Sequence, residues 1–162
     1  SLPFETLGND NETTARNNSS VICLLNLFGK KLLFTGDAGI PALKAAADVY
    51  ETSIGSFQAN PLRFFQVPHH GSKHNLGTDL LDRIFGPKDA PYSTDHHVFI
   101  SAAKQSLKHP SPKVTNAIMR RGCAPNRLAV TATAYGWIHH RYNSPDRPGS
   151  VSLDPFPILP ED

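Results

Sequence analysis

The amino-acid sequence predicts an α/β fold in which a mixed β-sheet is flanked by helices. Two observations support this class. Short apolar runs typical of buried strands alternate with segments whose apolar residues recur at helical spacing. The first two apolar runs, 21–28 and 32–34, are separated only by Gly29-Lys30-Lys31, which indicates a hairpin. The chain has 162 residues, of which 39% are apolar, so it is long enough for one compact domain.

After this hairpin, helices and strands alternate. Three segments have apolar residues at helical spacing: 41–50, 78–85 and 111–121. Four apolar segments read as further strands: 62–67, 97–101, 128–133 and 135–141. Pro41 suits a first helical turn, and Pro68 ends its strand because proline lacks the amide donor of a strand ladder. By composition, residues 1–17 form a polar lead-in, 18–144 the structured part, and 145–162 a proline-rich irregular tail.

The formal net charge is only +2, but the charges are unevenly distributed. Residues 96–144 contain no Asp or Glu. The same stretch has seven basic residues: Lys104, Lys108, Lys113, Arg120, Arg121, Arg127 and Arg141. Such a stretch is usually a solvated face, but it also presents a positive field to an anionic partner.

The cysteine content and the absence of a leader or spanning segment predict the cellular location of the chain. Two cysteines, Cys23 and Cys123, give no disulfide framework. The sequence contains neither a basic-then-apolar leader nor an apolar run of the ~20 residues that a spanning helix needs. We therefore expect a cytoplasmic location and no membrane partner. The start at Ser1 rather than Met suggests a fragment or a processed product.

Chemically active side chains follow two of the predicted strands. Gly36-Asp37 comes after the strand at 32–34, and His69-His70-Gly71-Ser72 comes after the strand at 62–67. Neighbouring strands with a helix between them bring such ends together at one edge of a sheet. Carboxylate and imidazole are ligands of Zn²⁺ or Mn²⁺, and a metal of this kind activates water for hydrolysis. The sequence therefore predicts part of a metal-dependent hydrolase site.

Five segments occur in a specific order within residues 18–140: Asn18-Ser19-Ser20-Val21, Leu33-Phe34-Thr35-Gly36-Asp37-Ala38, Val67-Pro68-His69-His70-Gly71-Ser72, His109-Pro110, and a strand pair around Gly136. Together they resemble the metallo-β-lactamase superfamily, and most closely its branch with the hydrolase domain of ComEC-type DNA-uptake proteins. The resemblance implies an αββα sandwich with two divalent metal ions, Zn or Mn, at the edge between its sheets. Residues 18–144 match the C-terminal half of that domain.

The resemblance also implies roles for individual residues. Asp37 matches the carboxylate that bridges both metals. Either His69 or His70 matches a metal ligand; we favour His70, which leaves His69 to hydrogen-bond or to orient the substrate. Ser72 and His109 match positions that contact a scissile phosphate.

Two further residues next to this motif, Lys73 and His74, are expected to reach the substrate. The other paired histidines are more often structural than functional: His96, His97, His139 and His140.

The main ligand motif of the family, His-x-His-x-Asp-His, is missing from this chain. In the family it precedes the segment seen here. We therefore expect the N-terminal half of the fold to be a partner, present as a separate, cleaved or truncated chain. A degenerate relative without that half is the remaining explanation.

The expected function is hydrolysis of phosphodiester bonds by metal-activated water, as in a nuclease or phosphodiesterase, because a basic stretch suits a nucleic acid or nucleotide substrate. Hydrolysis of a lactone, thioester or carboxylic ester is the alternative enzymatic reading. A non-catalytic, metal-free interaction module is the alternative of a different class.

Overall fold

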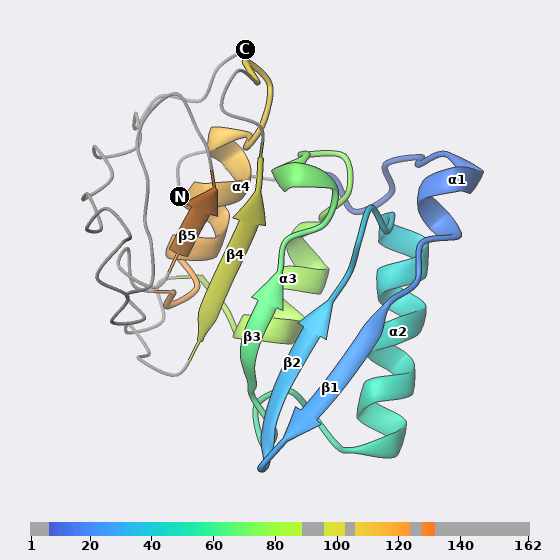
Figure 1. Ribbon diagram of the computed structural model, residues 1–162, viewed down its shortest axis with the longest axis vertical. Helices are drawn as coiled ribbons and strands as arrows, with labels where there is room; N and C mark the ends of the chain where they lie inside the picture. The colour runs from blue at the N-terminus through green and yellow to red at the C-terminus, as the bar shows by residue number, and fades with distance from the viewer. Residues whose placement is uncertain (1–6, 89–95, 103–105, 124–127, 132–162) are drawn as a thin grey trace, which may run out of the picture.

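The computed structural model describes residues 7–88, 96–102, 106–123 and 128–131, and its central element is a mixed five-stranded sheet. The strands lie side by side in chain order (Figure 1): β1 Cys23–Leu27, β2 Lys30–Phe34, β3 Leu62–Gln66, β4 His97–Ser101 and β5 Leu128–Thr131. β1 is antiparallel to β2, and each later strand is parallel to the one before it. The predicted hairpin and the strands after it are confirmed as far as residue 131.

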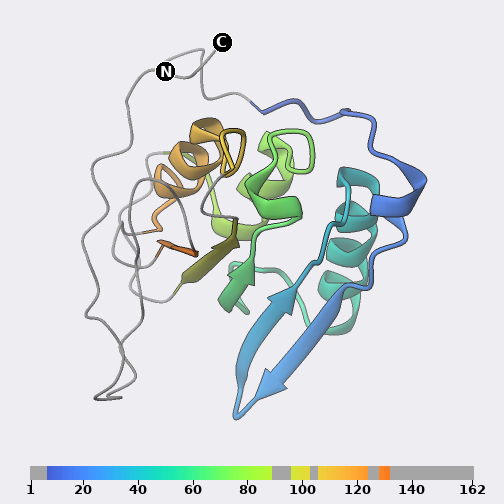
Figure 2. The same ribbon diagram turned by 45° about the horizontal axis from the view of Figure 1, so that its top comes forward.

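Within the described residues, four α-helices connect or precede these strands: α1 Ala15–Asn18, α2 Ile40–Ser53, α3 Thr78–Phe85 and α4 Pro112–Met119; a short 3-10 turn, His69–Gly71, follows β3. α2, α3 and α4 lie on one face of the sheet (Figures 1 and 2), which confirms the α/β class with a mixed sheet and flanking helices. The predicted strand 135–141 and the tail 145–162 lie outside the described residues. Among the described helices, none has the length and apolar character needed to cross a lipid bilayer.

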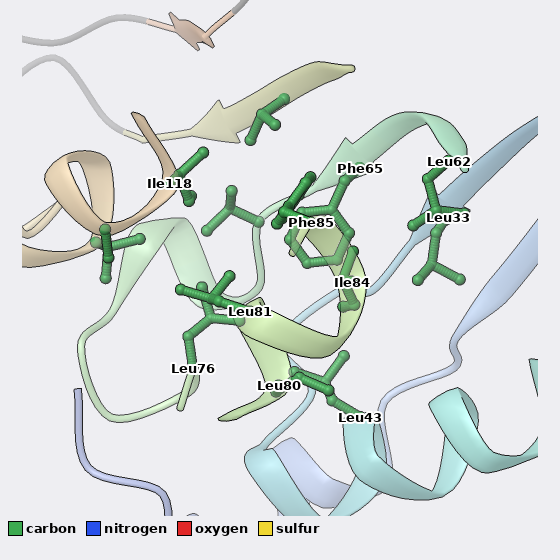
Figure 3. Packing of buried hydrophobic residues seen from close by; sticks show 14 of the residues in the cluster. Leu33, Leu43, Leu62, Phe65, Leu76, Leu80, Leu81, Ile84, Phe85 and Ile118 are labelled. Atoms are coloured by element: carbon green, nitrogen blue, oxygen red, sulfur yellow. The ribbon is translucent and has the colours of Figure 1, made fainter. Parts of the chain in front are cut away.

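The hydrophobic core fills the space between the sheet and these three helices. The sheet contributes buried apolar side chains from three strands: Leu33, Leu62, Phe65, Val98 and Ile100. The helices contribute residues at helical spacing, and Figure 3 shows several of them: Leu43, Leu80, Leu81, Ile84, Phe85 and Ile118. Phe65 and Phe85 meet edge to face at 5.5 Å between ring centroids. Each such buried side chain stabilises the fold by about 1.5–3 kcal/mol.

The other face of the sheet is also apolar, and no described helix covers it. Phe34, Phe64 and Phe99 form a row across β2, β3 and β4, with successive ring centroids 5.2 and 6.2 Å apart. The edge strand β1 continues this surface with Leu25 and Leu27, which are 45% and 48% exposed. We call these five residues the open apolar face.

The described part of the polar lead-in, residues 7–17, is held against the helices. The hydroxyl of Thr78 donates to the carbonyl of Leu7 and accepts from its amide, at 2.9 and 3.1 Å. The side-chain oxygen of Asn9 accepts from the amide of Asp79 at 3.0 Å. Its composition predicted only a loop, but the segment contains the single turn α1 and lies across α2 and α3.

Ion pairs join neighbouring helices behind the sheet. Arg83 on α3 lies 2.6 Å from Glu51 of α2, and the guanidinium of Arg121 donates to Asp82 of α3 at 2.7 Å. Arg121 also donates to the carbonyl of Ala117 and is only 1% exposed. Arg121 therefore cannot contribute to an exposed basic surface, as its place in the acid-free stretch suggested, because it is buried and paired.

Candidate functional site

Three loops meet at the edge of the sheet to which the arrowheads of β2, β3 and β4 point (Figure 1). The carbonyl of Gly36, in the loop after β2, accepts from the amide of His69 at 3.1 Å. The carbonyl of Gly71, in the loop after β3, accepts from the amide of Ser111 at 3.0 Å. These two backbone hydrogen bonds join the loops that contain Asp37, the His69-His70 pair and His109.

The loop after β3 has an unusual backbone conformation. His69, His70 and Gly71 are all left-handed, with φ of 45°, 58° and 82°. This conformation costs roughly 1–2 kcal/mol for each non-glycine residue. A Cβ on Gly71 would lie 2.8 Å from Cβ of Pro110, so the loop is also packed closely against the segment after β4. The surrounding structure therefore holds both imidazoles where local preference would not place them.

The rings of three histidines gather at this edge. The ring centroids of His69 and His70 are 5.8 Å apart, and that of His109 lies 5.9 Å from His69 and 6.5 Å from His70. His69 and His109 are half-buried, whereas His70 is exposed. Thus the structure brings together three of the residues that the sequence singled out.

The tautomer of His69 follows from its contact with Asn75. The amide nitrogen of Asn75 donates to the carbonyls of Asp37 and Ala38, both at 3.2 Å, which fixes its oxygen as the acceptor facing Nδ1 of His69 at 3.2 Å. In the neutral ring Nδ1 therefore has the proton and Nε2 the lone pair. The amide nitrogen of Asn17 also lies 3.0 Å from Nδ1, so this tautomer requires the Asn17 amide to be turned over, with its oxygen facing the ring.

His70 has the same tautomer for a similar reason. Its Nδ1 lies 2.5 Å from the carbonyl oxygen of Ser101, and a carbonyl can only accept. In the neutral ring the lone pair is therefore on Nε2, on the exposed side chain, where it is suited to a metal or to a proton.

His109 is held differently. Its backbone amide donates to the hydroxyl of Ser106 at 3.0 Å, and its ring Nδ1 is buried and has no hydrogen-bond partner among the described residues. Burial lowers the pKa of His109, and Coulombic interaction with His69, His70, Lys108 and His74 lowers it further. The ring is accordingly neutral at pH 7.

Asp37 lies in the loop after β2 and is half-buried. In the part of the chain that the structure describes, its carboxylate has neither a hydrogen bond nor an ion pair. Within that same part, no group of three or more His, Cys, Asp or Glu side chains is arranged to hold a metal ion. Asp37 and the histidines therefore offer ligand atoms of the right chemistry but not a complete coordination sphere.

A cavity of about 570 Å³ opens beside the histidines. The lead-in, the loop after β3 and the segment before α4 all contribute to its wall, with Glu12, Thr13, Thr14, Asn17, His69, Ser72, Lys73, His74, Asn75, Leu107, Lys108, His109, Ser111, Pro112 and Lys113. The wall contains three lysines, Lys73, Lys108 and Lys113, and a single acidic residue, Glu12. The cavity is therefore electropositive, and α4 begins at its edge.

The predicted site residues divide into two groups around this cavity. His69, Ser72, Lys73, His74 and His109 line it. Ser72 is buried, and its hydroxyl oxygen accepts from the amide of His74 at 3.2 Å. The remaining two, Asp37 and His70, belong to the same edge of the sheet but are not part of the cavity wall.

Several residues of the site had no signal in the sequence. Asn17 and Asn75 lie in segments whose composition indicated only loops, and Lys108 and Lys113 were two of seven basic residues without further distinction. Among the histidines given a structural role, His96 contacts the carbonyl of Leu62 through Nδ1 at 2.9 Å, in keeping with that role. His139 and His140 lie outside the described residues.

Comparisons of the chain with protein-family models, with curated proteins and with solved structures found no match. The fold and the site therefore define the class by themselves. The chain is an α/β protein with a mixed sheet, helices on one face, and a histidine-rich, electropositive site at the carboxyl ends of its parallel strands.

Proposed function

We propose that this chain is the C-terminal half of a metallo-β-lactamase-like hydrolase domain that cleaves phosphodiester bonds in a nucleic acid or nucleotide. The observation that supports this most is the gathering of the His69, His70 and His109 rings, 5.8–6.5 Å apart, beside a cavity with three lysines. Imidazoles suit a metal, and lysines suit a phosphate.

Asp37 and His70 would hold two divalent cations, Zn or Mn, together with ligands from the N-terminal half. Their donor chemistry fits, because the neutral His70 ring has its lone pair on Nε2 and the carboxylate of Asp37 has no partner among the described residues. When bound, such cations supply Lewis acidity and lower the pKa of a water molecule to about 7. The left-handed backbone of the His69-His70 loop keeps the imidazole in position before any ion binds.

The residues that line the cavity would handle the substrate. Lys73 and His74 would bind phosphate oxygens, and Ser72 would donate to one of them through its hydroxyl. His69 would orient the scissile group, because the lone pair on its Nε2 can accept a hydrogen bond from a protonated or polar group of the substrate. His109 is neutral at pH 7 and so is suited to accept a proton near the substrate.

The N-terminal half of the fold would cover the open apolar face. Phe34, Phe64 and Phe99, with Leu25 and Leu27, form a surface of the kind that a second sheet packs against in a sandwich. This half would also supply the ligands that complete the metal site.

The two alternative functions would use the metals and the apolar face differently. A lactone, thioester or carboxylic ester hydrolase would use the same metals, but three lysines around the cavity favour an anionic substrate. A metal-free interaction module would use the open apolar face and would not need the lone pair on Nε2 of His70.

Metal binding is the first test. Titration with Co²⁺, a visible-absorbing substitute for Zn²⁺, should give a spectrum for the chain combined with an N-terminal half, and both Asp37→Ala and His70→Ala should remove it. Asp48→Ala, an exposed carboxylate on α2, is the matched control and should leave the spectrum unchanged. A chain that binds no Co²⁺, alone or with an N-terminal half, would contradict the metal-dependent reading.

Hydrolysis is the second test. The chain combined with an N-terminal half should cleave bis(p-nitrophenyl) phosphate and DNA with Mn²⁺, and a lactone panel much more slowly. Faster turnover of lactones would select the alternative enzyme. Metal-independent binding of a protein, without turnover of either class, would select the interaction module.

A further inference from the structure

The cavity and the expected metal ligands do not coincide. Asp37 and His70 are absent from the cavity wall, whereas the neighbouring His69 is part of it. The rings of His69 and His70 are only 5.8 Å apart, so the cavity adjoins the proposed metal position without including it. A ligand that filled both would therefore extend from one to the other.

The charge of the cavity wall indicates what would fill it. Lys73 in the loop after β3, Lys108 in the segment before α4 and Lys113 in the first turn of α4 surround one space, opposed only by Glu12 among the lining residues. α4 begins at the same wall, with its N-terminal end at Pro112, and the side chain of Ser111 does not cap it. Cations and a helix N-terminus together favour an anion with several acceptor oxygens, as in a phosphate group.

The volume of the cavity indicates the size of the ligand. A space of about 570 Å³ is within the usual range for a small-molecule site and is far larger than a single phosphate ion requires. It therefore has room for a group attached to the phosphate, such as a nucleoside.

We propose that this cavity is a phosphate-binding site for a nucleotide unit, next to the position at which hydrolysis would occur. This site rests on the proposed function only for the position of hydrolysis. The substrate would then contain a second phosphate in addition to the one being cleaved, as an oligonucleotide strand does. The phosphate site itself needs no metal.

Calorimetric titration of the metal-free chain, in the presence of a chelator, tests the site directly. The probes are inorganic phosphate, thymidine 5′-monophosphate and thymidine. Both phosphates should bind and thymidine should not. If thymidine binds as tightly as its monophosphate, the cavity does not recognise phosphate and the proposal is wrong.

Charge variants locate the site. Lys113→Ala should weaken the affinity for thymidine 5′-monophosphate about threefold or more, and Glu12→Gln should strengthen it about twofold. A gain of affinity cannot come from misfolding, so the second variant keeps the test meaningful if the first is unstable. Lys30→Ala, at the start of β2 beside the hairpin turn, is the matched control and should have no effect.

Two outcomes would overturn the proposal. One is that Lys30→Ala weakens binding as much as Lys113→Ala, which would mean non-specific attraction to net charge. The other is that His70→Ala weakens binding and Lys113→Ala does not, which would place the anion outside the cavity. Failure of the proposed function is distinguishable, because it would appear as loss of Co²⁺ binding with phosphate binding intact.

Discussion

The side-chain oxygen of Asn75 lies 3.2 Å from Nδ1 of His69, while the nitrogen of the same amide donates to the carbonyls of Asp37 and Ala38. One buried side chain thus joins the loop after β2 to the loop after β3. It sets the tautomer of His69 and the position of the backbone that bears Asp37. Asn75 is therefore a positioning residue for both halves of the proposed metal site.

Asn75→Ala should lower the free energy of unfolding by about 1–3 kcal/mol, because two carbonyls and an imidazole lose a buried partner. Urea unfolding measures this change. Asn26→Ala, on the exposed strand β1, is the matched control and should change it by about 0.5 kcal/mol or less.

The positioning role has its own readout. Nitrogen-15 NMR of the imidazole ring should show the Nδ1-protonated tautomer of His69 in the native chain and a mixture in Asn75→Ala. A native ring with the proton on Nε2 would contradict the tautomer assigned here.

Gly71 should be far less tolerant of substitution than Gly29. Both glycines are left-handed, with φ of 82° and 77°, so alanine costs each about 1 kcal/mol in backbone strain. A Cβ at Gly71 also meets Pro110 at 2.8 Å, whereas one at Gly29 has nothing within 4 Å. Gly71→Ala should therefore cost about 1–3 kcal/mol more than Gly29→Ala in urea unfolding. Equal costs would mean that the loop does not pack on the segment after β4 as described.

His109 should make the stability of the metal-free chain depend on pH. Burial, and then Coulombic interaction with its neighbours, lowers its pKa in the folded state, so below about pH 6.5 the unfolded chain binds the proton more readily. Its contribution is fully present above that pH and is lost as the pH falls towards the lowered folded pKa.

Urea unfolding at pH 7.5 and pH 5.5 measures this dependence. His109→Gln should lose less stability between these two values than the native chain. The same loss in both chains would assign the pH dependence to other groups.

The open apolar face should bind a hydrophobic dye. Leu25→Lys and Leu27→Lys together should reduce dye fluorescence and change the unfolding free energy by only about 1 kcal/mol, since both side chains are already half exposed. Val49→Lys on α2 replaces an apolar residue that is 66% exposed on the helical side, and should leave the fluorescence unchanged. An unchanged signal in the double variant would show that the dye binds elsewhere.

The sequence predicted the order of elements well because each depends on short-range pattern. The hairpin followed from two apolar runs around Gly29, and α3 from four apolar residues on one helical face. The edge that holds the site followed as well, because parallel strands bring their carboxyl ends together.

Such local patterns do not predict contacts between side chains that are far apart in the sequence. Nothing near Arg121 in the sequence indicates that Asp82, on another helix, would pair with it and bury it. The same is true of Asn75, whose partners lie 6 to 38 residues away, and of Lys108 and Lys113, which meet Lys73 only in the folded chain. Pairing of this kind depends on tertiary structure and has no local periodicity.

The left-handed run at His69, His70 and Gly71 has a thermodynamic consequence for any ligand. The loop adopts its unfavourable backbone angles in the chain alone, so the cost of ordering it is met on folding and not on association. Binding at these imidazoles should accordingly lose little conformational entropy, and replacing either histidine by glycine should make the loop more variable without relocating it.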